Sequence, residues 1–367
     1  MMTIFQDPFS LSRIITFILA IVTISATFAS RLKWDDWWIR AFDFPRIQIS
    51  ALLLITLMLT AWVYDFSELW HFFLLFLLLC SLAYQAYRIY PYTLLAPKQV
   101  LSVQNQIIEP EKDNTVSVLV SNVLTPNRQS HRLLEVVRKK NPDILLTLES
   151  DKWWEDKLNV LEPDYPYTVK VPLDNLYGMH LYSRLELIDA EVNYLVESDV
   201  PSIETTVKLK SGKTIRLFCL HPAPPSPSQN ETSAERDAEL LMVANKLDAD
   251  NETILVMGDL NDVAWSRTTS LFLKMSGLLD PRRGRGFFNT FHAGHLLLRW
   301  PLDHIFHSND FKLIAMERQK NIGSDHFPIY SKLLYSSKAQ YAQNTTDSPS
   351  TEEKEEAVEK IKKGTEG

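Results

Sequence analysis

Polar side chains that can bind a metal ion or move a proton adjoin several apolar runs in the second half of the chain. These side chains are Asn122, Glu149, His221, Asp259, Asn261, Asp303, Asp325 and His326. Ligand-binding residues gather at strand ends, because the backbone ladder fixes them there while the adjoining loops leave them accessible. Carboxylate and amide oxygens suit Mg²⁺ or Mn²⁺, and a histidine beside an aspartate can act as acid or base near neutral pH. The pattern predicts a metal-assisted reaction centre.

Each of these signals also has a plainer interpretation when it is taken alone. GDLND is typical of a turn, and His221 before Pro222 can be a strand-end histidine bonded to backbone. The remaining histidines of this region have no spacing typical of metal ligands, so we interpret them as structural or surface residues. They are His292, His295, His304 and His307.

A local cluster of arginines consists of Arg282, Arg283, Arg285 and Arg299. One interpretation is a solvated loop. The other is a grip on substrate phosphate, for which guanidinium groups are well suited. Under the second interpretation, we expect Arg283 and Arg285 to bind substrate.

The elements that must position these side chains alternate between strands and helices. Residues 116–120 form a β-branched run typical of a strand, 132–139 a helix that ends at Asn141-Pro142, and 143–148 a second strand. Further strands are expected at 180–183, 202–209, 214–220, 253–257, 303–307 and 327–332, and helices at 233–247 and 266–275. This order predicts an α/β layered fold.

The first 90 residues differ, because they contain three long stretches without charge. These are residues 14–30, 47–64 and 69–87. Each is close to the ~20 apolar residues that cross a hydrocarbon core of about 30 Å. We expect residues 1–90 to be a membrane anchor of three transmembrane helices, with the lipid bilayer as partner. The alternative is a set of buried helices in a soluble core.

The basic residues of the first loop predict how the chain is oriented. Arg31, Lys33, Arg40 and Arg46 lie there, whereas the second loop has no lysine or arginine. Positive loops favour the cytoplasmic side. We therefore expect a multi-pass protein of the cell (inner) membrane with a cytoplasmic C-terminal domain.

Composition restricts the remaining possibilities. A formal net charge of −7 argues against a protein whose whole surface grips nucleic acid. Cys80 and Cys219 have neither zinc-site spacing nor an obvious disulfide partner. Residues 91–113 are expected to be a linker and 336–367 a disordered tail, because the tail has few apolar residues.

Seven segments together carry a family resemblance. They are SNVL, LTLES, YGMHLYSR, CLHPAPP, MGDLNDV, PLDHIF and GSDHFP. In this order they resemble the endonuclease/exonuclease/phosphatase superfamily, which includes DNase I-like nucleases, inositol-polyphosphate phosphatases and neutral sphingomyelinases. HPAPP and GRGFFNTF resemble membrane-anchored bacterial members. The resemblance covers residues 114–335 and implies an α/β (α+β) four-layer sandwich, two packed β-sheets flanked by helices, with the site at one edge.

The resemblance also implies a metal centre. Glu149 would be the main ligand for Mg²⁺ or Mn²⁺, helped by Asn122 and Asp325. One residue departs from the family pattern, because Leu148 occupies the position that is usually glutamine before the metal-binding glutamate. The ligand itself remains.

The catalytic roles implied by the resemblance fall on residues of the later motifs. Asp259 and Asn261 would orient the nucleophile and hold the phosphate. Asp303 would orient His326, which would activate the attacking water or contact the phosphate. His221 would stabilise negative charge that develops on the phosphate.

The sequence therefore predicts a membrane-anchored, divalent-metal-dependent phosphoesterase. It would hydrolyse a phosphodiester or phosphomonoester, in nucleic acid or a phospholipid head group, by in-line attack of an activated water. The alternative is a membrane-tethered binding module with a catalytically weak phosphoesterase fold. No obligatory protein partner is expected.

Overall fold

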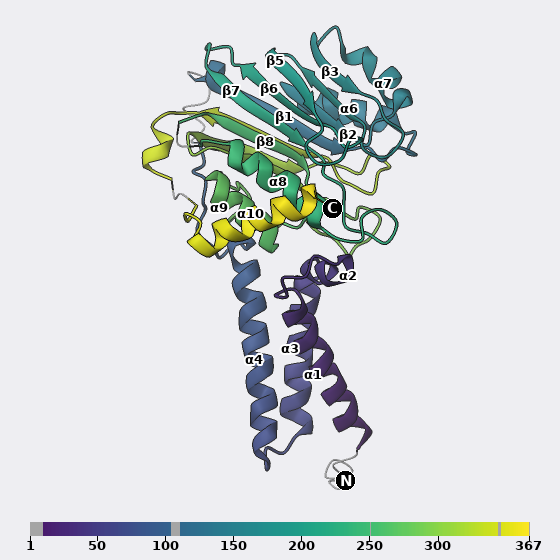
Figure 1. The fold of residues 1–367 in the computed structure, drawn as a ribbon, viewed down its shortest axis with the longest axis vertical. Helices are drawn as coiled ribbons and strands as arrows, with labels where there is room; N and C mark the ends of the chain where they lie inside the picture. Colours follow the sequence, from purple (N-terminus) through teal and green to yellow (C-terminus); the bar gives the residue numbers. More distant parts are fainter. Residues whose placement is uncertain (1–9, 104–110, 250, 344–345, 367) are drawn as a thin grey trace.

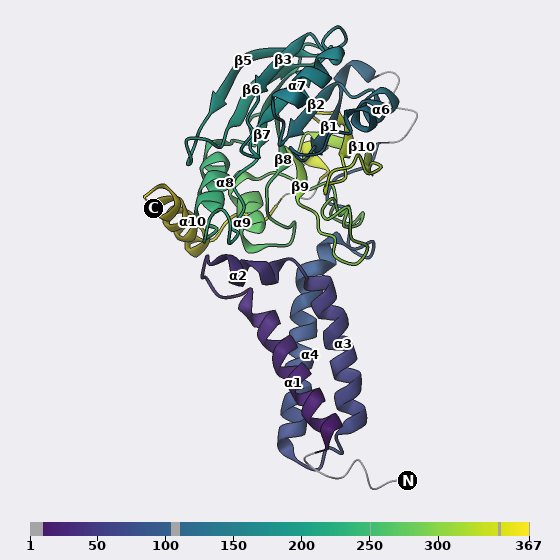
Figure 2. The same ribbon diagram turned by 90° about the vertical axis from the view of Figure 1, so that its right-hand side faces the viewer.

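Two β-sheets and their covering helices stand on a bundle of three long helices in the computed structural model of the protein (Figures 1 and 2). The structure describes residues 10–103, 111–249, 251–343 and 346–366. Residues 104–110 of the expected linker lie outside these ranges.

The helical bundle consists of α1 (Leu11–Ala29), α3 (Arg46–Val63) and α4 (Leu69–Ile89). All three are long and apolar enough to cross a membrane, with mean hydropathy of 2.0, 1.7 and 1.7. Ala20, Leu53 and Leu78 are fully buried between them, while most other apolar side chains point outward. This distribution suits helices surrounded by lipid rather than water.

One sheet has six strands in the order β10-β11-β1-β2-β4-β3, and the other has five in the order β5-β6-β7-β8-β9. The six-stranded sheet contains β1 (Thr115–Asn122), β2 (Ile144–Leu148), β3 (Tyr167–Val171), β4 (Met179–Ser183), β10 (Phe311–Arg318) and β11 (Ile329–Tyr335). The five-stranded sheet contains β5 (Glu186–Asn193), β6 (Ser202–Lys208), β7 (Thr214–Leu220), β8 (Ile254–Asp259) and β9 (Asp303–His307).

Helices cover the outer faces of both sheets. Helices α6 (Ser130–Lys140) and α7 (Lys152–Leu158) pack on the six-stranded sheet, and α8 (Ala234–Lys246) and α9 (Arg267–Ser276) pack on the five-stranded sheet. The inner faces share one apolar core. The predicted four-layer sandwich is therefore confirmed.

Each sheet contains one parallel strand pair joined by a helical crossover. Strand β1 pairs with β2 around α6, and β7 pairs with β8 around α8. The carboxyl ends of parallel strands lie at the same edge of a sheet. This arrangement brings the polar residues that follow these four strands to one edge of the sandwich.

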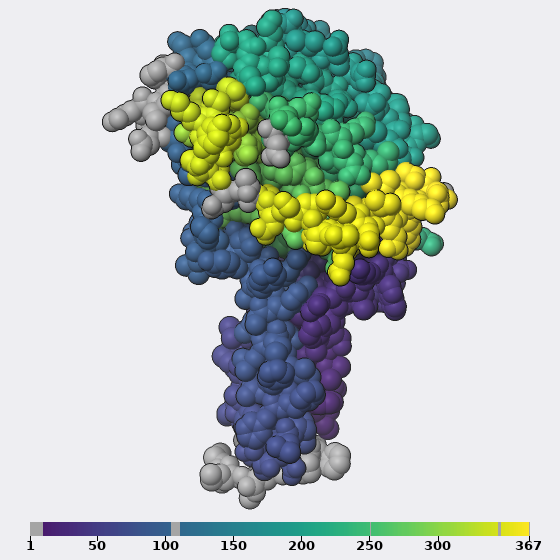
Figure 3. Space-filling model, turned by 60° about the vertical axis from the view of Figure 1, so that its left-hand side comes forward, coloured from purple at the N-terminus to yellow at the C-terminus, as the bar shows by residue number. Residues whose placement is uncertain are grey.

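The C-terminal region corrects the expectation of a disordered tail. Helix α10 (Thr351–Thr365) begins with a capping box formed by Ser350 and Glu353, and Ala357 is fully buried against α8 and α9. Figure 3 shows the C-terminal residues in yellow lying across the domain, close to the N-terminal segment. Ion pairs supply much of the contact between α10 and the domain. The small number of apolar residues in this segment therefore did not predict that the helix would pack there.

Lys360 of α10 joins the domain to the helical bundle. Its Nζ lies 2.9 Å from Asp35, in the loop after α1, and 2.7 Å from Asp237 of α8. Burial raises the pKa of both carboxyls, but Lys360 and a second cation beside each, Lys363 and Arg236, outweigh burial and lower it. Burial lowers the pKa of Lys360, and the two carboxylates outweigh this effect and raise it.

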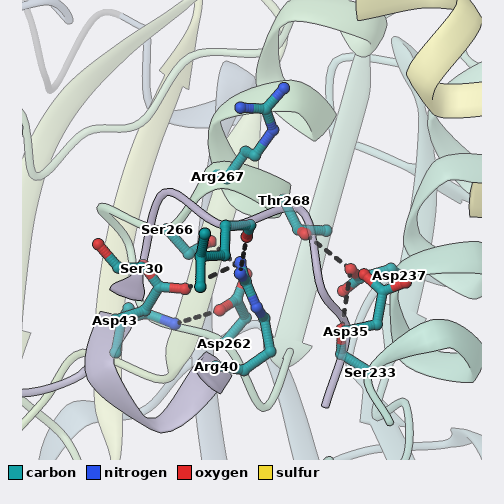
Figure 4. A network of polar contacts seen from close by, with 12 residues as sticks. Ser30, Asp35, Arg40, Asp43, Ser233, Asp237, Asp262, Ser266, Arg267 and Thr268 are labelled. Carbon is teal, nitrogen blue, oxygen red and sulfur yellow. Dashed lines mark hydrogen bonds and ion pairs between the residues drawn. The ribbon is translucent and has the colours of Figure 1, made fainter. Parts of the chain in front are cut away.

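The loop between α1 and α3 includes α2 (Trp37–Arg40) and docks on the domain through buried polar groups (Figure 4). Asp43 accepts hydrogen bonds from Arg40 at 3.3 Å and Arg46 at 2.5 Å. The backbone oxygen of Asp43 accepts from Trp265 Nε1 at 2.8 Å, and that of Asp35 accepts from the Ser233 amide at 2.7 Å. The domain is therefore fixed to the bundle rather than loosely tethered.

Candidate active site

The carboxyl ends of the two parallel strand pairs meet at one edge of the sandwich. Asn122 ends β1, Glu149 follows β2, and Asp259 ends β8. Asn122 Nδ2 donates to Glu149 Oε1 at 2.8 Å and lies 3.2 Å from Asp259 Oδ2. The Asn122 amide thus links the polar ends of the two sheets.

Glu149 has the features of a cation ligand. Its Oε2 is buried, and no hydrogen-bond partner for it is present among the residues that the structure describes. Burial raises the pKa of Glu149 to about 7, and the nearby carboxylates of Asp325 and Asp259 add to this effect. A buried carboxylate oxygen without a donor is costly unless a cation neutralises it. Oxygen donors of this kind fit a Mg²⁺ or Mn²⁺ ion.

His326 lies between two carboxylates. Its Nδ1 lies 2.8 Å from Asp303 Oδ2, and its Nε2 lies 3.4 Å from Asp259 Oδ2. Burial lowers the pKa of His326, but Asp303 and Asp259 outweigh burial and raise it to about 10. The fold thus brings together Asp303, which opens β9, and His326, which lies in the loop before β11. In this arrangement His326 is an imidazolium that is hydrogen-bonded to Asp303 and forms an ion pair with Asp259.

Asp259, Asp303 and His326 also offer ligand atoms within 4.8 Å of one another, close enough to share a metal ion. The contacts of His326 already account for this spacing, because one ring nitrogen is hydrogen-bonded to Asp303 and the other forms an ion pair with Asp259. The Glu149 oxygen that has no partner among the described residues is therefore the better candidate for a cation ligand.

His221 and Asn261 complete the cluster. Burial lowers the pKa of His221 to about 4, so its ring is neutral at pH 7, and its Nδ1 has no partner within the described ranges. Asn261 has a left-handed backbone with φ of 50°. Its amide N–H donates to Asp259 Oδ1 at 3.0 Å, and its Nδ2 donates to the oxygen of Pro222 at 3.0 Å. Asn261 thereby fixes the loop that carries His221.

Asp325 lies beside the cluster but is held differently. Its Oδ1 accepts a hydrogen bond from Ser324 at 3.3 Å, and its backbone oxygen accepts from the Ala293 amide at 2.6 Å. Its carboxylate is close enough to raise the pKa of Glu149. Leu148, where the family usually has glutamine, points into the apolar core and adds no polar group to this edge.

The arginine cluster corrects the expectation that Arg283 and Arg285 bind substrate. Arg285 Nη2 donates to Ser102 Oγ at 3.0 Å, and the Arg283 guanidinium lies over the Tyr92 ring at 5.8 Å. Both side chains therefore hold the segment between α4 and β1 and do not contact the cluster around Glu149. The direction in which a loop side chain points cannot be read from sequence, because a loop has no periodicity that fixes it.

Arg299 of the arginine cluster and Arg318 of β10 lie over the residue that follows His326. The guanidinium groups of Arg299 and Arg318 lie 5.1 Å and 4.5 Å from the ring of Phe327, the residue after His326. No carboxylate partner for either is found in the described part of the chain. Burial lowers the pKa of Arg318, and the nearby charge of Arg299 adds to this effect. Arg318 could not be singled out from the sequence, because its strand β10 was not predicted.

Solved structures with similar folds include TDP2 of D. rerio in complex with a single-strand DNA product, at a TM-score of 0.50 and 16% identity, covering 60% of this chain and 98% of that chain. The human Nocturnin catalytic domain with bound sulfate also has a TM-score of 0.50 and 16% identity, covering 61% and 95%. An endonuclease/exonuclease/phosphatase from Beutenbergia cavernae has a TM-score of 0.50 and 14% identity, covering 61% and 72%.

At these identities the structures establish the fold alone. No curated protein sequence matches the chain. The family model described as the endonuclease/exonuclease/phosphatase family matches residues 119–326, a range that contains the whole cluster from Asn122 to His326. The chain therefore belongs to the endonuclease/exonuclease/phosphatase family, with the phosphoesterase-type fold of that family.

Proposed function

We propose that the protein is a membrane-anchored, divalent-cation-dependent phosphoesterase that uses water to cleave a phosphate ester. The observation that carries this proposal is the Glu149 carboxylate oxygen that has no partner within the described ranges. It lies across the Asn122 amide from Asp259, which forms an ion pair with His326, and His326 is hydrogen-bonded to Asp303. A cation site and a proton-transfer group therefore lie within one buried cluster.

Glu149 would hold Mg²⁺ or Mn²⁺, with Asn122 and Asp325 as its helpers. The cation supplies Lewis-acid polarisation of the phosphate when it is bound. Asn122 keeps the Glu149 carboxylate turned toward the cluster through their 2.8 Å hydrogen bond.

Asp259 is the candidate base. Burial raises its pKa, but His326, His221 and two hydrogen bonds outweigh burial and lower it, so this carboxyl is ionised at neutral pH. An ionised, buried carboxylate can accept the proton of the attacking water. Asn261 fixes Asp259 through its backbone N–H.

His326 then contacts the phosphate rather than deprotonating water. A ring with pKa near 10 carries its proton at neutral pH and is therefore not available as a base. Its positive charge suits the negative charge that grows on the phosphate oxygens. Of the two roles implied by the family resemblance, this geometry favours phosphate contact for His326. The neutral ring of His221 is the candidate for a second hydrogen bond to the phosphate.

We also propose that α1, α3 and α4 span the cell membrane and hold the domain on its cytoplasmic side. The domain contacts the loop between α1 and α3, so it shares the side of that loop (Figure 2). Arg31, Lys33, Arg40 and Arg46 give the loop its positive charge, which favours the cytoplasm.

The test uses the full chain with bis-p-nitrophenyl phosphate and p-nitrophenyl phosphate as soluble substrates. We expect hydrolysis of at least one of them with Mg²⁺ or Mn²⁺, its loss on adding EDTA, and its loss in Glu149→Gln. A well-folded full chain that binds phosphate esters without hydrolysing them under any of these conditions would favour the binding module instead.

A further inference from the structure

An apolar pocket of about 410 Å³ lies where the domain meets the helical bundle. Its lining residues come from the loop after α1 and from two loops of the domain. They are Trp37, Arg40, Ala41, Phe44, Pro45, Pro225, Leu298 and Trp300. Apolar side chains predominate, and the guanidinium of buried Arg40 is engaged by Asp43 and the oxygen of Leu32. The pocket therefore suits a hydrocarbon better than a polar group.

Two lining residues, Pro225 and Trp300, connect the pocket to the catalytic cluster. Pro225 belongs to the segment HPAPP that begins with His221. The ring of Trp300 stacks on Phe291 with centroids 6.2 Å apart, and Phe291 packs on His326 at 4.9 Å. One layer of aromatic rings therefore separates the pocket from His326.

The same pocket lies at the end of a helix that is apolar enough to cross a membrane. Pro45 and Phe44 immediately precede α3. In the first turn of α3, Gln48 donates to the backbone oxygen of Leu297 at 2.6 Å. Leu296 and Leu297 are each 80% exposed at this place. Exposed leucines beside the end of a membrane-spanning helix are expected to enter the bilayer surface.

Polar groups lie between the pocket and His326. Trp300 Nε1 is buried, and no acceptor for it lies among the described residues. Arg299 and Arg318, which have no carboxylate partner in that part of the chain, lie over Phe327 beside His326. These guanidinium groups each donate to one backbone oxygen, of His295 and of Asn289, and keep further N–H groups. A buried indole N–H and two arginines without a carboxylate partner in the described ranges suit the ester and phosphate oxygens of a lipid head group.

We infer that the substrate is a phosphoester of a membrane lipid, with an acyl chain in this pocket and its phosphate at the catalytic cluster. This inference rests on the proposed function. In the reaction, the oxygen of water bonds to phosphorus and the bond from phosphorus to one ester oxygen breaks. One proton of the water passes to Asp259 and then to the leaving oxygen, so the products are an alcohol and a phosphate with one ester bond fewer.

The first test is the dependence of rate on alkyl chain length. Alkyl p-nitrophenyl phosphates with progressively longer chains are given, below their micelle-forming concentration, to the full chain held in an amphipathic polymer instead of detergent. We expect kcat/KM to rise by up to ~4-fold for each added methylene until the pocket is filled, the factor that corresponds to ~0.8 kcal/mol per buried methylene.

Two variants connect this dependence to the pocket. Leu298→Glu places a charge on the pocket wall, and Ala41→Trp fills the pocket. In each variant, the ratio of kcat/KM between the longest and the shortest substrate should be at least ~10-fold smaller than in the wild type. Leu95→Glu is the matched control, because Leu95 is 84% exposed and lies outside the pocket. It should retain the rise.

A second measurement does not depend on any variant. A phospholipid with a diazirine on its acyl chain, in vesicles with the wild-type chain, should cross-link within residues 37–45 or 296–300 after irradiation. Cross-links confined to the outward faces of α1, α3 and α4 would overturn the inference.

The outcomes separate the two proposals. Hydrolysis of bis-p-nitrophenyl phosphate without any chain-length dependence overturns the lipid inference and leaves the phosphoesterase intact. A higher kcat/KM for oligonucleotides than for every alkyl substrate overturns it in favour of nucleic acid. Absence of any metal-dependent hydrolysis overturns the proposed function itself.

Discussion

Asp303 and His326 should act as one catalytic unit, and their coupling can be measured. The replacement Asp303→Asn removes the charge from the 2.8 Å contact with His326 Nδ1 and leaves the longer, 3.4 Å contact with Asp259 in place. A hydrogen bond to a charged group contributes about 1.5–3 kcal/mol. At 1.36 kcal/mol for each tenfold change in rate, kcat should fall between ~10-fold and ~10²-fold.

His326→Ala removes both contacts and the positive charge at the phosphate, so kcat should fall by ~10²-fold or more. Once the imidazole is absent, Asp303 has nothing to orient. The double variant should therefore be within ~3-fold of His326→Ala. The assay is kcat for bis-p-nitrophenyl phosphate at saturating Mg²⁺, with thermal melting to check the fold.

A matched control is Asp189→Asn, since Asp189 is an exposed aspartate of β5 with φ of 49°, a conformation that asparagine tolerates. It should leave kcat unchanged. If the losses of Asp303→Asn and His326→Ala multiplied in the double variant, the two residues would act independently, and the proposed unit would be refuted.

The remaining predictions concern the cation, the C-terminal helix and the junction with the bundle. Glu149→Gln should abolish most of the heat of Mg²⁺ binding in calorimetry while circular dichroism stays unchanged; an unaltered isotherm would remove Glu149 as the ligand. Because the pKa values of Asp35 and Asp237 are lowered in the folded protein, their stabilisation is complete above about pH 4 and is lost as pH falls through the folded values. Proteolysis of α10 should thus accelerate only below about pH 4, and acceleration between pH 5 and 9 would contradict this. Lys360→Met should lower the free energy of unfolding by ~1–3 kcal/mol in denaturant titrations. This loss is smaller than for an isolated buried ion pair, because Asp35 and Asp237 each keep a second cation. An unchanged free energy of unfolding would mean that these ion pairs do not stabilise the packing of α10. Removal of residues 1–92 should expose Trp265 and cause self-association in size-exclusion chromatography, and a monomeric product would show that the junction is dispensable.

Buried strands were predictable from sequence, including the buried edge strand β9, whereas the exposed edge strands were not. The strands β1, β2, β7 and β8 lie inside the sheets and are largely buried, so they appear as continuous apolar runs. By contrast, β3, β5 and β10 lie at sheet edges and expose much of their surface. Polar residues on an edge strand resist pairing with another chain, and they also hide the strand from a hydrophobic pattern.

Site residues at strand ends could be named, but side-chain directions could not. The strand-end positions explain why Glu149, Asp259 and Asp303 could be selected as candidates, because the sheet itself fixes where they lie. Arg285 has the right chemistry for phosphate and lies in a loop that turns it toward Ser102. The protonation of His326 also required the structure, since only the fold places Asp259 beside Nε2. The protonation state of a buried group depends on its distances to neighbouring charges, and the sequence does not contain these distances.

Glu149 and Asn261 adopt left-handed backbone conformations, with φ of 57° and 50°. For glutamate this conformation costs roughly 1–2 kcal/mol relative to the right-handed region, whereas asparagine tolerates it. Glycine carries no such penalty, so Glu149→Gly should relieve local strain while removing the proposed cation ligand. Laboratory selection of this chain for thermal stability alone would therefore favour loss of activity at Glu149, and a library screened for activity would keep the less stable residue.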